Sequence, residues 1–159
     1  MTQLILRRYK KEDIEQCIVQ TQAFLIEQRK GKYQNHYKEL DLDTEKMYNG
    51  LVSRLNDPDF FLNIITADKE IVGGLCGYIA SPMFSNHRIA YDQMFYITPK
   101  FKNLKAVMKL IQSYIYWAEQ RDAVECRLCS STGFNQQGFT KLCQRNNFTQ
   151  FEVGFVRKF

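Results

Sequence analysis

The segment from Ile89 to Glu119 constrains the fold of this chain more than any other part of it. It is typical of a strand that ends at Pro99, a lysine-bearing loop and a long amphipathic helix. A further strand is expected over 124–129, so the helix is long enough to be the crossover between two parallel strands. A loop that enters a helix N-terminus also presents unpaired N–H groups and the positive end of the helix dipole, which together favour phosphate. The segment therefore predicts both a parallel strand pair and an anion site.

Hydrophobic spacing and turn residues predict the remaining elements, in the order β-α-α-β-β-β-α-β-α-β. The expected fold is α/β in the broad sense (α+β): a mixed, mostly antiparallel central sheet flanked by helices, in a single domain over 1–159. The expected strands cover 4–9, 60–67, 71–80, 89–97, 124–129 and part of 148–159, and the expected helices cover 12–29, 44–55, 104–120 and 139–145.

Composition narrows the functional class. The 159 residues suit one domain, and the net charge of +5 is too small to indicate a nucleic-acid-binding protein. The five cysteines and two histidines lack the spacing of a disulfide framework or a zinc site, so no metal is expected. Neither a signal peptide nor a membrane-spanning apolar run is visible, and we expect a cytoplasmic protein with no membrane partner.

Three segments carry a family resemblance: DKEIVGGLCGYI (68–79), MFYITPKFKN (94–103) and KLCQRNNF (141–148). Their order and spacing resemble the GNAT family of acyl-CoA-dependent N-acyltransferases over nearly the whole chain. The resemblance implies an N-acetyltransferase that moves an acetyl group from acetyl-CoA to a primary amine of a small molecule or a protein. The amine is not readable from the sequence. Family members are often homodimers, and nothing in the sequence fixes the oligomeric state.

The resemblance also implies which residues contact acetyl-CoA. In the family, the strand backbone at the positions of Phe95, Tyr96 and Ile97 binds the pantetheine arm and polarises the thioester carbonyl. A loop asparagine, here Asn135, touches the cofactor. The pyrophosphate loop falls on Lys102, Asn103, Leu104, Lys105, Ala106 and Val107.

That loop departs from the family pattern. Lys105 and Val107 stand where the family has glycine or another small residue, and side chains there either crowd the pyrophosphate or must turn away from it. The alternative is a loop that no longer binds CoA and whose lysines are simply hydrated.

Two residues are candidates for catalysis. Asp92 is the only carboxylate between Glu70 and Glu119, and the resemblance makes it the candidate base. Cys143 stands where the family often has a tyrosine that protonates the leaving thiolate. A structural carboxylate and a buried cysteine are the alternatives. Asn147 replaces a family glycine, and asparagine tolerates the left-handed backbone that such a turn needs.

The acceptor side is less defined. In the family, the first two helices and the loop between them form the wall of the amine site, and we call this region the acceptor wall. Here it is rich in aromatic and acidic residues, which suits a cationic amine or is simply an exposed polar loop. These residues are Tyr33, His36, Tyr37, Glu39, Asp41, Asp43 and Tyr48. Two other functions stay open. One is a catalytically degenerate GNAT-fold structural or binding module, and the other is a small nucleic-acid-binding protein that uses the basic tracts.

Overall fold

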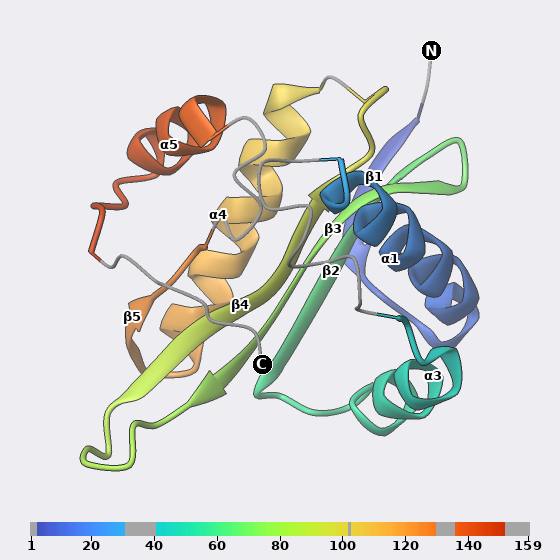
Figure 1. The fold of residues 1–159 in the computed structure, drawn as a ribbon. Coiled ribbons are helices and arrows are strands. Elements are labelled where there is room, and N and C mark those ends of the chain that lie inside the picture. Colours follow the sequence, from blue (N-terminus) through green and yellow to red (C-terminus); the bar gives the residue numbers. More distant parts are fainter. Residues whose placement is uncertain (1–2, 31–40, 102, 130–135, 152–159) are drawn as a thin grey trace.

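The computed structural model describes residues 3–30, 41–101, 103–129 and 136–151. Its centre is one sheet with the strand order β1-β2-β3-β4-β5 (Figure 1). Strands β1 to β4 pair antiparallel with one another, and β5 pairs parallel with β4, so the mixed and mostly antiparallel sheet is confirmed. The strands are β1 (Leu4–Arg8), β2 (Phe60–Ala67), β3 (Glu70–Ala80), β4 (Arg88–Ile97) and β5 (Ala123–Cys126).

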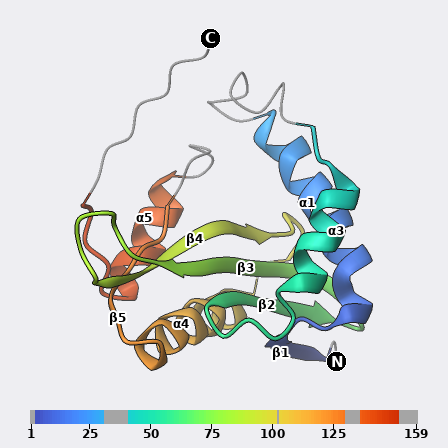
Figure 2. The same cartoon turned by 90° about the horizontal axis from the view of Figure 1, so that it is seen from below.

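Helices cover both faces of this sheet. Helices α1 and α3 lie on one face and α4 lies on the other, as the view along the sheet shows (Figure 2). Helix α4 is the expected crossover between β4 and β5. The helices are the short 3-10 turn Lys11–Asp13, α1 (Ile14–Gln28), α3 (Thr44–Ser53), α4 (Leu104–Gln120) and α5 (Gln136–Arg145).

The core has two halves, one on each side of the sheet. One half packs α1 and α3 against the sheet through buried residues such as Ile14, Leu51 and Ile64. The other packs α4 against it through Leu75, Leu110 and Tyr114, among others. Because β2 supplies buried side chains to both halves, its sequence is a nearly continuous apolar run rather than an alternating one.

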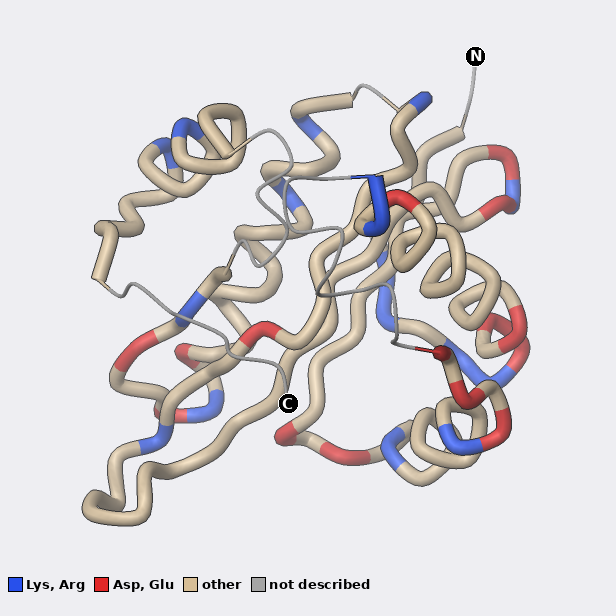
Figure 3. The backbone as a smooth tube through the Cα atoms, viewed as in Figure 1, with Lys and Arg blue, Asp and Glu red and all other residues tan. Residues whose placement is uncertain are grey.

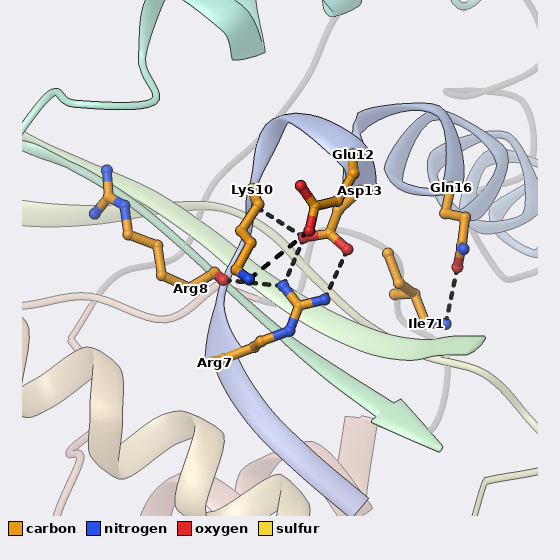
Figure 4. A network of polar contacts seen from close by, with 7 residues as sticks. All are labelled: Arg7, Arg8, Lys10, Glu12, Asp13, Gln16 and Ile71. Carbon is orange, nitrogen blue, oxygen red and sulfur yellow. Dashed lines mark hydrogen bonds and ion pairs between the residues drawn. The ribbon is translucent and has the colours of Figure 1, made fainter. Parts of the chain in front are cut away.

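An ion pair fastens β1 to the start of the first helix (Figure 4). The two guanidinium nitrogens of Arg7 donate to the two carboxylate oxygens of Asp13 at 2.6 and 2.8 Å. The backbone N–H of Lys10 also donates to Asp13, at 2.7 Å. Asp13 is buried, and these bonds hold its pKa below the usual value, with the Arg7 hydrogen bond as the largest cause. The ion pair therefore stabilises the fold by linking a strand to the helix that covers it.

The structure corrects the C-terminal part of the predicted fold. The strand expected over 124–129 ends at Cys126, because Asp92 rather than a β4 carbonyl binds the N–H of Cys129. The last helix begins at Gln136, not at 139. Residues 148–151 form no strand, and the rest of the expected final strand lies outside the described residues.

Among the described residues, no helix is both long and apolar enough to cross a membrane. No group of three or more metal-ligating side chains gathers in that part of the chain either.

Candidate functional site

Strands β4 and β5 separate from each other as they run forward. They pair from Arg88 to Ala90, and the N–H of Arg127 then donates to the carbonyl of Ala90 at 2.8 Å. The last link is the N–H of Cys129, which donates to the side chain of Asp92 at 3.0 Å. Within the described residues, no strand pairs with this side of β4 beyond that point. We call this opening the fork, with Asp92 at its apex.

The backbone of β4 beyond the fork apex has groups that face the open side. The N–H of Thr98 donates to Val72 of β3, so the backbone groups of Thr98 and Tyr96 point toward β3. In an antiparallel ladder the direction alternates, and the N–H and C=O of Phe95 and Ile97 therefore point into the fork. Of the three predicted backbone contacts, Phe95 and Ile97 can therefore bind a ligand in the fork, whereas the backbone groups of Tyr96 point toward β3.

A β-bulge lies just beyond the fork apex. Cys76 pairs with Met94 while Gly77 pairs with Asp92, so Gln93 is the extra residue on β4. Opposite the bulge, Gly77 leaves room for the ring of Tyr114, which rises from α4. A Cβ on Gly77 would lie 2.8 Å from that ring and 2.7 Å from the carbonyl oxygen of Tyr91.

Sequence reasoning did not identify this contact between Gly77 and Tyr114. A glycine inside a strand is nevertheless a signal of a bulge or of a close approach, and it was present.

Asp92 is half-buried on the α4 side of the sheet. Burial raises the pKa of its carboxyl group, because the charged form loses water. Hydrogen bonds from the backbone and the side chain of Cys129 act in the opposite direction and are weaker. The net shift is toward the range in which a carboxylate serves as a base near neutral pH.

Cys143 lies on α5 and faces the same region. Its pKa is raised to about 11, first by burial and second by the negative charge of Asp92. The two candidate catalytic residues, 51 positions apart in the sequence, are therefore close enough to interact electrostatically.

The end of α5 confirms the prediction for Asn147, which has a φ of +61°. Asn147 and Phe148 donate to the carbonyls of Gln144 and Cys143, respectively, which is a Schellman ending.

Helix α4 begins at the predicted anion site. The side chain of Asn103 accepts a hydrogen bond from the N–H of Ala106 at 3.0 Å, so Asn103 is the N-cap. This cap, which sequence reasoning did not assign, occupies one of the expected free donors. The N–H groups of Leu104 and Lys105 have no partner within a helix of this geometry and remain the donors available to an anion. Lys102 lies outside the described residues.

Positive charge gathers around this helix start. Lysine and arginine positions lie in the first half of α4 and in α5 (Figure 3). The side chains concerned are exposed: Lys100, Lys105, Lys109, Lys141 and Arg145. Val107 is half-buried, so it packs against the protein rather than projecting freely. The combination of a helix dipole and several exposed cations suits a multiply charged phosphate.

Comparisons with known proteins agree with this architecture. No protein-family model and no curated protein matches the chain. Solved structures do match. A predicted acetyltransferase with acetyl-CoA from Clostridium acetobutylicum has a TM-score of 0.72 and 13% identity, over 98% of this chain and 96% of that one. An aminoglycoside N-acetyltransferase in complex with CoA has a TM-score of 0.71 and 15% identity, covering 99% and 96%.

A third match is an aminoglycoside acetyltransferase from an uncultured soil metagenomic sample, in complex with sisomicin, with a TM-score of 0.69 and 16% identity over 98% and 96% of the chains. The chain has a GNAT fold. The predicted family resemblance is thereby confirmed at the level of the fold, and the low identities carry it no further.

Within this GNAT fold, Tyr96 has its side chain on the α1 side of the sheet. Its ring meets Phe24 edge to face at 5.6 Å, and its pKa is raised by burial and then by the nearby charge of Glu27. Of the predicted acceptor wall, Asp41 forms a long ion pair with Arg29 at 3.5 Å.

Of the other acceptor-wall residues, two are described by the structure and four are not. Asp43 caps α3 by accepting the N–H of Lys46 at 2.9 Å, and Tyr48 packs on the core. Tyr33, His36, Tyr37 and Glu39 lie outside the described residues, as does the predicted cofactor contact Asn135.

A shallow depression of about 360 Å³ opens elsewhere, at the edge formed by β1 and β2. Its lining includes Gln3, Arg7 and Lys69. Because β1 and β2 are separated from the fork by β3, this depression is not part of the candidate site.

Proposed function

We propose that the chain is an N-acetyltransferase that uses acetyl-CoA to acetylate a primary amine. The observation that carries the proposal is the open fork beside the N-terminus of α4. Phe95 and Ile97 offer backbone groups on the open side, and the cationic helix start lies just beyond them along the chain. A long ligand with an anionic end and a hydrogen-bonding arm fits this arrangement, and the acetyltransferases of the same fold that contain CoA or acetyl-CoA support it.

In the proposed reaction the amine nitrogen attacks the carbonyl carbon of the thioester, the carbon–sulfur bond breaks, and CoA leaves as a thiolate that takes up a proton. A backbone N–H of β4, from Phe95 or Ile97, donates to the carbonyl oxygen as negative charge develops there. Asp92 accepts the proton that the amine loses. Its burial raises its pKa, which is the direction that general base catalysis requires.

The pKa of Cys143 limits its proposed role. At about 11 it lies above the value of about 8.5 for an ordinary thiol, so full transfer of its proton to a leaving thiolate is uphill. We therefore assign Cys143 the role of a hydrogen-bond donor to the departing sulfur, and the thiolate takes up the proton that Asp92 received from the amine, delivered through solvent. A Cys143→Ala variant then loses only part of the rate, whereas Asp92→Asn loses about 10²- to 10⁴-fold.

Titration calorimetry with acetyl-CoA tests the first requirement. We expect saturable binding that Lys105→Ala weakens about three- to tenfold, because an exposed cation beside a phosphate contributes modestly. Lys46→Ala, which removes an exposed lysine from the unrelated helix α3, is the matched control and leaves the affinity unchanged. Absence of heat and of any thermal shift at millimolar acetyl-CoA would refute the proposal.

A specific observation favours one alternative, a GNAT-fold module without catalysis. Asn103 already occupies the N–H of Ala106, and Lys105 stands where a small residue is expected. A Lys105→Gly variant separates the two functions. Release of CoA on adding an amine, by the wild type or by the variant, indicates a working site, whereas no release by either protein supports the module.

A further inference from the structure

An aromatic surface lies on the α1 side of the sheet beside the fork. Tyr78 of β3 and Tyr91 of β4 are direct partners across the two strands. Their rings are stacked, with centroids 5.7 Å apart and an angle of 21° between the planes. Tyr78 keeps 37% of its surface exposed, so this stacked pair is not sealed into the core.

An arginine extends the surface toward β5. The guanidinium carbon of Arg127 lies 5.0 Å from the ring centre of Tyr91 and 5.2 Å from that of Phe151. Phe151 is 75% exposed. We call Tyr78, Tyr91, Arg127 and Phe151 the aromatic face. Flat groups stacked in this way offer ring surface to a further flat group, for which offset stacking is favourable.

The aromatic face adjoins the fork apex. Tyr91 is the residue before Asp92, and side chains of successive strand residues point to opposite faces. Asp92 therefore projects toward α4 while Tyr91 projects toward α1, on either side of the strand where the fork opens. One end of a molecule bound to the aromatic face therefore lies at the fork.

The charge of this surface is balanced. Glu125 accepts two hydrogen bonds from Arg127, at 2.9 and 2.5 Å. Asp59, whose carbonyl binds the residue after Tyr78, has its carboxylate bound by Arg88 at 2.5 Å. Asp92 is bonded to the N–H of Cys129, so the carboxylates of Glu125, Asp59 and Asp92 each have a partner. A polycation such as an aminoglycoside must compete with these partners for the carboxylates, whereas a ligand with a single charge needs fewer of them.

We propose that the acceptor is a monoamine carried on an aromatic ring, that its ring stacks on the aromatic face, and that its amine reaches the fork. This inference rests on the proposed acetyltransferase function and adds the class of acceptor to it. The neighbours of known structure named for aminoglycosides share the fold, and the aromatic face predicts a different acceptor preference for this chain.

The test measures CoA release from acetyl-CoA with three amines: 2-phenylethylamine, n-propylamine and kanamycin. We expect 2-phenylethylamine to have the highest kcat/KM. Tyr78→Ala and Phe151→Ala each raise its KM about three- to tenfold, the worth of one ring contact, without changing the KM of acetyl-CoA. Tyr78→Phe keeps the ring and retains the wild-type KM. Tyr116→Ala removes an exposed tyrosine from α4 and is the control.

The outcomes separate the two proposals. If acetyl-CoA binds and kanamycin is the preferred acceptor, or if Tyr78→Ala leaves the KM for 2-phenylethylamine unchanged, the aromatic acceptor is refuted and the acetyltransferase function stands. If acetyl-CoA does not bind, the acetyltransferase function itself fails. If Tyr78→Ala instead converts a dimer to a monomer in sedimentation velocity, the aromatic face is a subunit interface and the inference is overturned.

Discussion

Replacing Gly77 by alanine tests the central packing of the sheet. The added methyl group meets the carbonyl oxygen of Tyr91 at 2.7 Å and the ring of Tyr114 at 2.8 Å, both closer than carbon atoms at this position normally approach. The ring can rotate away only by disturbing its stacking on Trp117 and its hydrogen bond to the carbonyl of Arg127 at 3.3 Å. The oxygen belongs to the backbone of β4 and cannot move alone. The strain must therefore spread through two strands and a helix.

The expected cost follows from that geometry. Adding a methyl group to a close-packed core typically costs about 1–3 kcal/mol, and two simultaneous contacts, one of them with backbone, place this variant at the upper end. For a chain of this size each kcal/mol corresponds to about 2–4 °C in Tm. We therefore expect Gly77→Ala to lower the Tm by about 5–10 °C.

Thermal unfolding followed by circular dichroism measures this change, and Gly50→Ala is the control. Gly50 lies in α3, and a Cβ there meets nothing within 4 Å. Alanine is favoured over glycine in a helix by about 0.5–1 kcal/mol, so this variant gains stability. Equal Tm values for Gly77→Ala and the wild type would show that the close contact is not rigid and would refute the reasoning.

Three further predictions concern charge and protonation. Asp13→Asn lowers the free energy of unfolding at pH 7, measured in urea, by about 2–3 kcal/mol. This is less than the loss of a fully buried ion pair, because Arg7 is partly exposed. The control Glu12→Gln changes the free energy of unfolding by less than about 0.5 kcal/mol. Because the pKa of Asp13 is lowered in the folded state, this loss of stability is present above about pH 4 and becomes smaller as the pH falls further. A loss of stability that is constant down to pH 2 contradicts the lowered pKa. The effect of pH on stability has the opposite sign for Asp92. Its pKa is raised in the folded state, so its negative charge destabilises the fold above about pH 4. Asp92→Asn is therefore no less stable than the wild type at pH 7, and a lower stability of the variant contradicts the raised pKa. The rate of alkylation of Cys143 by iodoacetamide, read by peptide mass mapping, rises with pH to a midpoint near pH 11, and a midpoint near pH 8.5 contradicts the raised pKa.

Local signals in the sequence predicted most of the elements. The bounds of β2 and α4 are those expected, because each is an apolar pattern closed by clear turn residues. The turn between β2 and β3 was also expected, and the positive φ values of Asp68 and Lys69 are those of a tight hairpin. These features depend on neighbours within a few residues and are readable for that reason.

Other features depend on contacts between distant residues. The early end of β5 follows from the bond between Cys129 and Asp92, which are 37 residues apart. The close packing of Tyr114 against Gly77 brings a helix next to a strand, and the hydrophobic periodicity of the sequence does not predict such a contact. For the site, Asp92 and Cys143 were chosen from a family resemblance, and their electrostatic interaction appears only once α5 is placed beside the sheet.

The packing at Gly77 also links stability to the proposed chemistry. The oxygen that blocks a methyl group there belongs to Tyr91, which carries the aromatic face on one side and precedes Asp92 at the fork apex. A shift of β4 at this point moves the acceptor surface, while the start of α4, which holds the proposed anion site, is anchored separately by Asn103. Gly77→Ala should therefore raise the KM of the amine more than that of acetyl-CoA, at a temperature where the variant is folded. Equal changes in both values would mean that the fork moves as one unit with α4.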